Sequence, residues 1–261
     1  MRNTANFSYL ALIYFFLYIP ILILIVYSFN NAQYSLLWHG FSFRWYQELF
    51  SDGDLWIAAR NTFFLGVSAA TIAMGLGALT AISLFRYKFF GRQLLYALII
   101  ILILSPDIVM GISLLILFTF GKIQLGYWSL LLAHITFCMP YVVITVYSRM
   151  ASFDEYLFEA AKDLGAKDSI ILKRIILPLL WPALFAGWLL SFSMSIDDVI
   201  ISYFVAGPDF QILPLTIYSM VRLGVKPEIN ALCAITFAVT LILIIFSVYI
   251  MQKKPSHFRA Q

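Results

Sequence analysis

Three carboxylates in strongly apolar surroundings have the clearest chemical potential in this sequence. Asp107, Asp197 and Asp198 lie inside or near the end of long apolar stretches. Each would cost about 2.5 to 3.5 kcal/mol at the centre of a membrane helix, so three of them indicate a function. No Lys or Arg lies at comparable depth in these stretches. The local field is therefore expected to be negative, and the expected ligand is a cation.

Carboxylates on two different helices could hold two ammonium groups of an extended polycation. Aromatic neighbours such as Tyr203 and Phe204 could each add about 0.5 to 2 kcal/mol through cation–π contacts. Adjacent helix positions point about 100° apart, so Asp197 and Asp198 need not both face one cavity. An alternative is that these carboxylates bond to freed backbone groups or to nearby serines and only hold the helices together.

Long apolar segments must position these side chains. Hydrophobic residues make up 62% of the chain and charged residues 11%, which is typical of an integral membrane protein. The sequence predicts an all-α membrane protein with six transmembrane helices in a single domain, residues 1–261. The predicted spans are 8–29, 61–85, 93–120, 127–148, 179–204 and 229–251.

The third span is overlong, and Ser105-Pro106-Asp107 interrupts it. We expect a break there, because proline removes a helical hydrogen bond. At about 1.5 Å per residue, Asp107 and Asp197 each lie roughly 20 to 25 Å from the cytoplasmic face. The two carboxylates are therefore expected at one level, in the outer half of the membrane.

Basic residues predict the orientation. Twelve of the 17 Lys and Arg residues lie before the first span, after the second, after the fourth and at the end of the chain. The positive-inside rule then places both termini and loop 149–178 in the cytoplasm. The net charge of +4 reflects this topology. The sequence has no basic stripe with interleaved aromatics, so we expect no nucleic-acid partner.

Loop 149–178 contains a polar island with helix signals. Ser152 and Glu155 have the spacing of a capping box, and Gly165 is a natural helix stop. The segment between them predicts a short amphipathic helix that lies on the membrane or fills a groove in a partner. Its expected apolar face consists of Phe153, Leu157, Ala160, Ala161 and Leu164.

The same island carries a spaced motif. Glu159-Ala160-Ala161 is followed after three residues by Gly165, and after nine more by Ile175-x-Leu177-Pro178. This pattern resembles the cytoplasmic coupling loop of ABC-transporter permease subunits. The resemblance implies a type I, MetI-like importer permease fold. It also implies that Glu159, Ala160, Ala161 and Gly165 form a coupling site for a separate ATPase homodimer.

Several other stretches narrow the resemblance to PotC-type permease subunits of spermidine/putrescine ABC transporters. They are 105–110, 134–140, 147–149, Asp197-Asp198 and 212–215. The resemblance implies a heteromeric complex in a bacterial inner membrane. Its other members would be a second, similar permease subunit, the ATPase and a polyamine-binding protein on the outer face.

ATP hydrolysis is assigned to another chain, because no G-x-x-x-x-G-K-[ST] occurs. ATP and Mg²⁺ belong to that partner, and no cofactor or metal is expected here. The sequence contains neither H-E-x-x-H nor G-x-S-x-G, so no enzymatic activity is predicted. A transporter with two ATPase sites needs two coupling loops, which again predicts a second permease subunit.

Two other transport functions remain open. The chain could serve an ABC importer for another cationic solute, or it could be an ion-coupled secondary transporter, and nucleotide dependence of uptake would separate these classes. Among the remaining features, Gly75, Gly77 and Ala81 predict close helix packing. His134 is interpreted as a hydrogen-bonded packing residue in preference to a proton relay.

Overall fold

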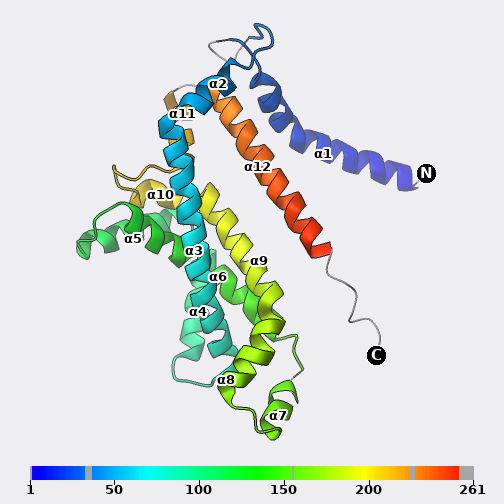
Figure 1. Ribbon diagram of the computed structural model, residues 1–261, viewed down its shortest axis with the longest axis vertical. Coiled ribbons are helices and arrows are strands. Elements are labelled where there is room, and N and C mark those ends of the chain that lie inside the picture. Colours follow the sequence, from blue (N-terminus) through cyan, green and yellow to red (C-terminus); the bar gives the residue numbers. More distant parts are fainter. Residues whose placement is uncertain (1, 33–36, 155, 224–226, 253–261) are drawn as a thin grey trace. The chain divides into compact units, whose positions relative to one another are not determined.

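The computed structural model describes residues 2–32, 37–154, 156–223 and 227–252. This part of the chain is helical apart from turns, loops and one isolated bridge between Asn30 and Phe41 (Figure 1). Backbone proximity divides the chain into two compact units. One comprises Met1–Trp56 with Ile217–Gln261, and the other comprises Ile57–Thr216.

The first unit contains the two ends of the chain. Its helices are α1 (Arg2–Tyr27), α2 (Arg44–Ser51) and α12 (Pro227–Gln252), together with the start of α3 (Gly53–Arg86) and the end of α11 (Leu213–Leu223). Helix α12 packs against both α1 and α2. In α1, residues Tyr9–Tyr27 are long and apolar enough to cross a membrane.

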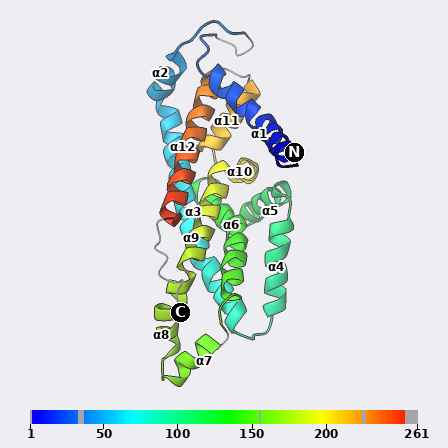
Figure 2. The ribbon, with the colours of Figure 1, turned by 90° about the vertical axis from the view of Figure 1, so that its right-hand side faces the viewer.

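The second unit carries the candidate site. Besides most of α3 and the start of α11, its elements are α4 (Arg92–Leu104), α5 (Asp107–Phe120), α6 (Tyr127–Met150), α7 (Tyr156–Asp163), α8 (Asp168–Ile171), the π-helical turn η1 (Leu172–Ile176), α9 (Leu177–Asp197) and α10 (Ile200–Val205). Helix α6 packs against α4, α5, α9 and α10 (Figure 2). The chain runs from α7 and α8 at one end of this unit to α10 near the other (Figures 1 and 2).

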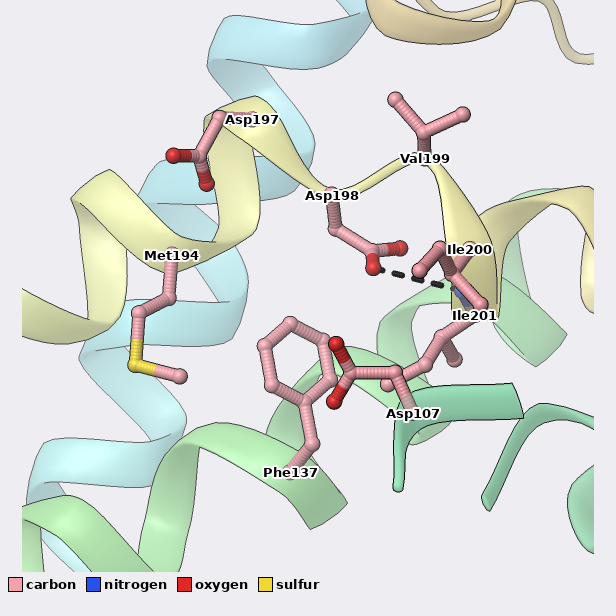
Figure 3. A pocket seen from close by; sticks show the side chains of 8 residues that line it. All are labelled: Asp107, Phe137, Met194, Asp197, Asp198, Val199, Ile200 and Ile201. Atoms are coloured by element: carbon pink, nitrogen blue, oxygen red, sulfur yellow. Dashed lines mark hydrogen bonds between the residues drawn. The ribbon is translucent and has the colours of Figure 1, made fainter. Parts of the chain in front are cut away.

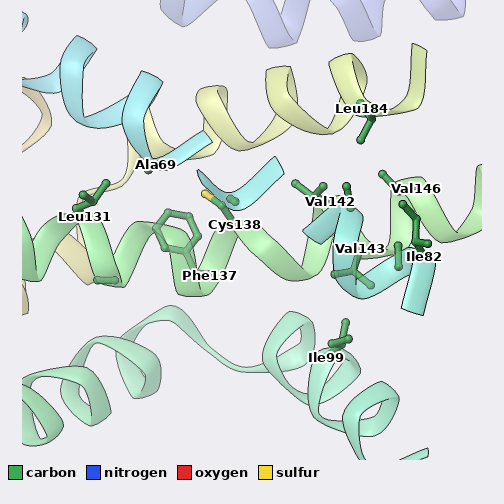
Figure 4. Packing of buried hydrophobic residues seen from close by; sticks show 14 of the residues in the cluster. Ala69, Ile82, Ile99, Leu131, Phe137, Cys138, Val142, Val143, Val146 and Leu184 are labelled. Atoms are coloured by element: carbon green, nitrogen blue, oxygen red, sulfur yellow. The ribbon is translucent and has the colours of Figure 1, made fainter. Parts of the chain in front are cut away.

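Glycine permits the close packing around α6. Val142 is fully buried in the core, which Figure 4 shows. A Cβ atom built on Gly77 would lie only 2.7 Å from the Val142 Cβ, and one on Gly187 would lie 3.4 Å from its Cγ1. The prediction is therefore confirmed for Gly77 and for Ala81, which is fully buried. Within the described chain Gly75 has no such contact, because an added Cβ would meet nothing within 4 Å.

The predicted break in the third span is confirmed. Helix α4 ends at Leu104, α5 begins at Asp107, and the two are bent by 115°. Four unbroken helices of the described residues can cross a membrane by length and composition, and this bent pair would make five. The described apolar part of α12, Glu228–Ile242, is shorter than a span. The all-helical class is thus established, while the number six stays a prediction.

The fifth predicted span, 179–204, is wrong in its C-terminal part. Helix α9 ends at Asp197, Asp198 is extended with ψ 122°, and a separate short helix begins at Ile200. Towards the other end, helical structure begins before residue 179, because α8 and η1 lead directly into α9. The helix therefore ends at a place where the sequence has no proline or glycine, and Asp168–Asp197 is long and apolar enough by itself to cross a membrane.

The helix stop at Gly165 is confirmed. Gly165 has φ +77°, its N–H donates to the Lys162 carbonyl at 2.8 Å, and the Ala166 N–H donates to the Ala161 carbonyl at 3.1 Å. These two bonds form a Schellman motif, which glycine permits because it has no Cβ.

The start and the apolar face of α7 differ from expectation. Glu155 lies outside the described residues, so the capping box is not tested. Asp154 instead accepts the Tyr156 N–H through its side chain at 3.0 Å. The predicted face is divided: Ala161 is buried, whereas Ala160 is exposed and Leu164 is 88% exposed. Two expected members of one apolar face are thus accessible from outside the chain.

Candidate functional site

The helices that follow the two breaks, α5 and α10, lie against each other. Pro106 cannot donate a helical hydrogen bond, and Ser105 before it is extended with ψ 133°, so the chain restarts as α5. A Cβ atom built on Gly111 would lie 2.7 Å from Cδ2 of Phe204 and 3.4 Å from Cα of Ile201. Glycine therefore permits this close approach.

A pocket of about 390 Å³ lies at these breaks (Figure 3). All three carboxylates singled out from the sequence contribute to it. Its lining residues are Asp107, Phe137, Met194, Asp197, Asp198, Val199, Ile200 and Ile201. No lining residue is basic, so the pocket has a negative electrostatic field that favours a cation.

Asp198 is fully engaged with the chain. One carboxylate oxygen accepts the Ile201 N–H at 3.2 Å, and the other accepts the Ser202 N–H at 2.8 Å and the Ser202 hydroxyl at 2.7 Å. The Asp198 side chain is 8% exposed. Asp198 immediately precedes Val199, the N-cap position of α10, and its carboxylate caps the first turn as an N-cap side chain would. The geometry thus corresponds to the alternative that a carboxylate bonds to freed backbone.

Asp107 and Asp197 differ from Asp198. Both are exposed within the described chain, and neither accepts a hydrogen bond from another residue that the structure describes. Asp107 lies in the first turn of α5, where the helix dipole favours a negative charge. These two carboxylates line the pocket with oxygens that remain available to a ligand.

The pocket also includes side chains that the sequence did not indicate. Phe137 presents its ring beside Asp107, and the Met194 side chain reaches the same space from α9 (Figure 3). Tyr203 is not among the lining residues, so its substrate contact stays a prediction. Phe137 lies three residues after His134 and therefore on the same side of α6, which was the available signal in the sequence. Only the fold shows that Phe137 meets Asp107.

His134 is the hydrogen-bonded packing residue that the sequence predicted. Its side chain is completely buried. Nδ1 lies 2.6 Å from the Ser195 hydroxyl and Nε2 lies 3.0 Å from the Ser202 hydroxyl. The imidazole therefore joins α6 to α9 and α10 directly behind Asp198.

The residues of the predicted coupling site occupy a different region of the unit. Glu159 and Ala160 are exposed on α7, Ala161 faces the chain, and Gly165 forms the turn after the helix. Arg86, at the end of α3, forms an ion pair with Asp168 of α8. The α7–α8 segment therefore has an exposed surface and is connected to the long helix α3 through this ion pair.

Within the residues that the structure describes, no group of three or more His, Cys, Asp or Glu side chains is arranged to hold a metal ion. The two cysteines, Cys138 and Cys233, are both unpaired thiols.

Residues 73–254 match the family described as "Binding-protein-dependent transport system inner membrane component". The chain is 51% identical over 247 residues to the spermidine/putrescine transport system permease protein PotC of Escherichia coli strain K12, covering 95% of this chain and 94% of that protein. It is 50% identical to PotC of Haemophilus influenzae, with 94% and 96% covered. It is 38% identical to the putrescine transport system permease protein PotI of Escherichia coli strain K12, with 97% and 92% covered.

Two solved structures share the fold at low sequence identity. A bacterial ABC transporter involved in the import of the acidic polysaccharide alginate matches with a TM-score of 0.74 and 18% identity, covering 97% of this chain and 96% of that chain. The methionine ABC transporter MetNI matches with a TM-score of 0.57 and 16% identity, covering 74% and 90%. At these identities the likeness establishes the fold, and the substrate must be argued from the site.

Proposed function

The chain belongs to the family of binding-protein-dependent transport system inner membrane components, and from this premise we propose that it is a permease subunit of an ATP-driven importer for polyamines. The relatives with 50% and 51% identity over nearly the whole chain are named for spermidine and putrescine. Both compounds carry ammonium groups separated by apolar methylene chains.

The acidic pocket is the observation that carries the substrate proposal. Asp107 and Asp197 offer two carboxylates from different helices, and no basic residue lines the space between them. Phe137 offers an aromatic face to a cation or a methylene chain. An anionic substrate would instead require basic side chains, which this pocket lacks. The complete pathway would be shared with the second permease subunit.

Coupling to ATP is proposed to occur through α7. This helix presents Glu159, Ala160 and the adjacent Leu164 to the outside, while Ala161 packs towards the chain. An exposed helix with small residues fits a groove of a partner protein. We assign this groove to an ATPase homodimer that binds ATP and Mg²⁺, with one α7 from each of two homologous permease subunits.

Transport would then proceed by alternating access. Closure of the ATPase dimer would draw the two coupling helices together and rotate the helices attached to them. The acidic pocket would open towards the extracytoplasmic polyamine-binding protein, accept the cation, and return to the cytoplasmic side after hydrolysis. The two carboxylates must bind weakly enough to release the polyamine in each cycle.

The proposed location is the bacterial cytoplasmic membrane with both termini in the cytoplasm. The membrane location follows from the family description and the apolar helices. The orientation rests on the distribution of Lys and Arg and on the need for α7 to meet an ATPase.

Uptake by a reconstituted complex tests this proposal. The full complex, with its second permease, ATPase and binding protein, would be placed in liposomes, and uptake of labelled spermidine and putrescine measured with and without ATP. We expect uptake to require ATP and to persist when proton and sodium gradients are abolished. Excess unlabelled polyamine should compete, whereas excess alginate or phosphate should not.

Two results would overturn parts of the proposal. Uptake that needs an ion gradient and no ATP would identify a secondary transporter. If the complex takes up a different cation with ATP and polyamines do not compete, the assignment as an ABC permease would stand, and the assignment of polyamines as the substrate would be wrong.

A further inference from the structure

The break between α9 and α10 leaves backbone N–H groups that need partners, since an unsatisfied group is costly within a membrane. Asp198 supplies the partner for two of them, the amides of Ile201 and Ser202. The same carboxylate also accepts the Ser202 hydroxyl. Asp198 therefore holds the start of α10 in place with both of its oxygens.

A second connection runs from this cap into the core of the unit. The Ser202 hydroxyl lies 3.0 Å from His134 Nε2, and His134 Nδ1 lies 2.6 Å from the Ser195 hydroxyl. His134, Ser195 and Ser202 are each at most 1% exposed. One imidazole thus connects α6 with the end of α9 and the first turn of α10, on both sides of the break.

The number of available protons sets the direction of one bond. Ser202 has a single hydroxyl proton, which it donates to Asp198, because an ionised carboxylate can only accept. The Ser202 oxygen must then accept from His134, so Nε2 carries a proton. In the neutral imidazole Nδ1 accepts from Ser195. The order of donation is Ser195 to His134 to Ser202 to Asp198.

Asp107 and Asp197 have no comparable engagement. They line the same pocket, yet neither accepts a hydrogen bond from another described residue. Asp198 contributes negative charge to the pocket, but its side chain is almost covered. The pocket therefore contains one carboxylate used by the fold and two that are available to a ligand.

We propose that His134 is a positioning residue, which through Ser202 holds Asp198 as the cap of α10 and thereby leaves Asp107 and Asp197 as the pair that binds a cationic substrate. This inference rests on the proposed function for the identity of the substrate, whereas the arrangement of His134 does not depend on it. Loss of the connection should loosen the start of α10, and with it the wall of the pocket formed by Val199, Ile200 and Ile201.

Two serines on α9 provide a matched comparison. Ser195→Ala removes the partner of His134 Nδ1. Ser191→Ala, one turn earlier, removes a hydroxyl that is also buried but has no hydrogen-bond partner in the described structure. Ser202→Ala removes the hydroxyl that donates to Asp198 and contacts His134, but it keeps the backbone N–H that donates to Asp198.

The first measurement is nitrogen NMR of the full complex with ¹⁵N-labelled histidine in lipid nanodiscs. His134→Gln identifies the His134 signals by their absence. We expect a protonated Nε2 and an unprotonated Nδ1 in the unaltered protein and in Ser191→Ala. A proton on Nδ1 and none on Nε2 would overturn the proposed connection.

The second measurement is polyamine uptake by the same variants. Ser195→Ala and Ser202→Ala should each raise KM by about tenfold, the effect of one lost buried hydrogen bond, while Ser191→Ala remains unchanged. Ser202→Thr, which keeps a hydroxyl, should be closer to the unaltered protein than Ser202→Ala.

The two measurements separate the two proposals. If the expected His134 tautomer is found but neither serine changes KM relative to Ser191→Ala, the positioning role is overturned. If the unaltered complex takes up no polyamine and the tautomer is found, the proposed substrate fails, while the connection of His134 to Asp198 is supported.

Discussion

Arg86, in the last turn of α3, forms an ion pair with Asp168 at the start of α8, across 82 positions of the sequence. The Arg86 guanidinium also lies over the ring of Phe158, 5.7 Å from its centroid. Arg86 therefore contacts the chain on both sides of the Gly165 turn. A displacement of the α7–α8 segment would be transmitted directly to α3.

Substitution of Arg86 by Ala should uncouple ATP hydrolysis from transport. Asp168 is largely exposed, so the pair itself contributes only about 0 to 1 kcal/mol to stability. We expect the variant to assemble with a nearly unchanged Tm, and the amount of polyamine taken up per ATP hydrolysed to fall severalfold. Parallel assays of phosphate release and uptake in proteoliposomes measure this ratio.

Lys88→Ala is the control, since it removes an exposed cation two residues further along. The exchanged pair, Arg86→Asp with Asp168→Arg, should recover part of the coupling lost by either change alone. An unaltered ratio in Arg86→Ala would show that the ion pair does not transmit motion.

Neutralisation of Asp107 or Asp197 should weaken polyamine uptake. Hydrogen bonds to charged groups contribute about 1.5 to 3 kcal/mol, so Asp107→Asn and Asp197→Asn should each raise KM roughly 10- to 100-fold. The exposed loop residue Asp209 lies outside the pocket lining, and Asp209→Asn should have little effect. Initial uptake rates at a series of spermidine concentrations give the KM of each variant. Equal KM values in all three variants would exclude direct substrate contact.

The exposed end of α7 should bind the ATPase. Leu164 is 88% exposed, so Leu164→Asp should leave the Tm of the isolated chain unchanged while lowering its affinity for the ATPase by at least about tenfold. Phe90, fully exposed in the loop before α4, provides the control Phe90→Asp. Co-purification and titration with the ATPase measure the affinity. Equal binding by both variants would place the contact elsewhere.

Two glycines on α3 should respond oppositely to the same substitution. Gly77→Ala places a methyl group against Val142 and should destabilise the protein by about 1 to 3 kcal/mol. Gly75→Ala meets open space and should be neutral or stabilising by up to about 1 kcal/mol. The Tm in detergent compares them. If Gly77→Ala has the same Tm as Gly75→Ala, the proposed steric origin is wrong.

Local chemistry explains which features of the fold could be predicted from the sequence. Pro106 cannot continue a helix, and the break between α4 and α5 is found there. Gly165 adopts a positive φ at little cost, and α7 ends there. In both cases one residue type restricts the backbone regardless of what surrounds it.

The break between α9 and α10 could not be predicted in this way. Residues 197–205 contain neither Pro nor Gly, and the apolar pattern continues through them. The helix ends because Asp198 bonds to the amides of Ile201 and Ser202, and because His134 supports Ser202 from another helix. Contacts between helices that are far apart in the sequence therefore favour the capping hydrogen bonds of Asp198 over continued helical hydrogen bonds.

By itself, the sequence showed that acidic residues interrupt or end long apolar segments, and it predicted a coupling motif after the fourth of these segments, because composition and spacing are properties of the linear chain. Only the tertiary structure decided that Asp107 shares a pocket with Asp197 while Asp198 serves as a cap. It likewise decided that Leu164 faces outward. The direction in which a side chain points, and the partner that it meets, depend on how the helices pack.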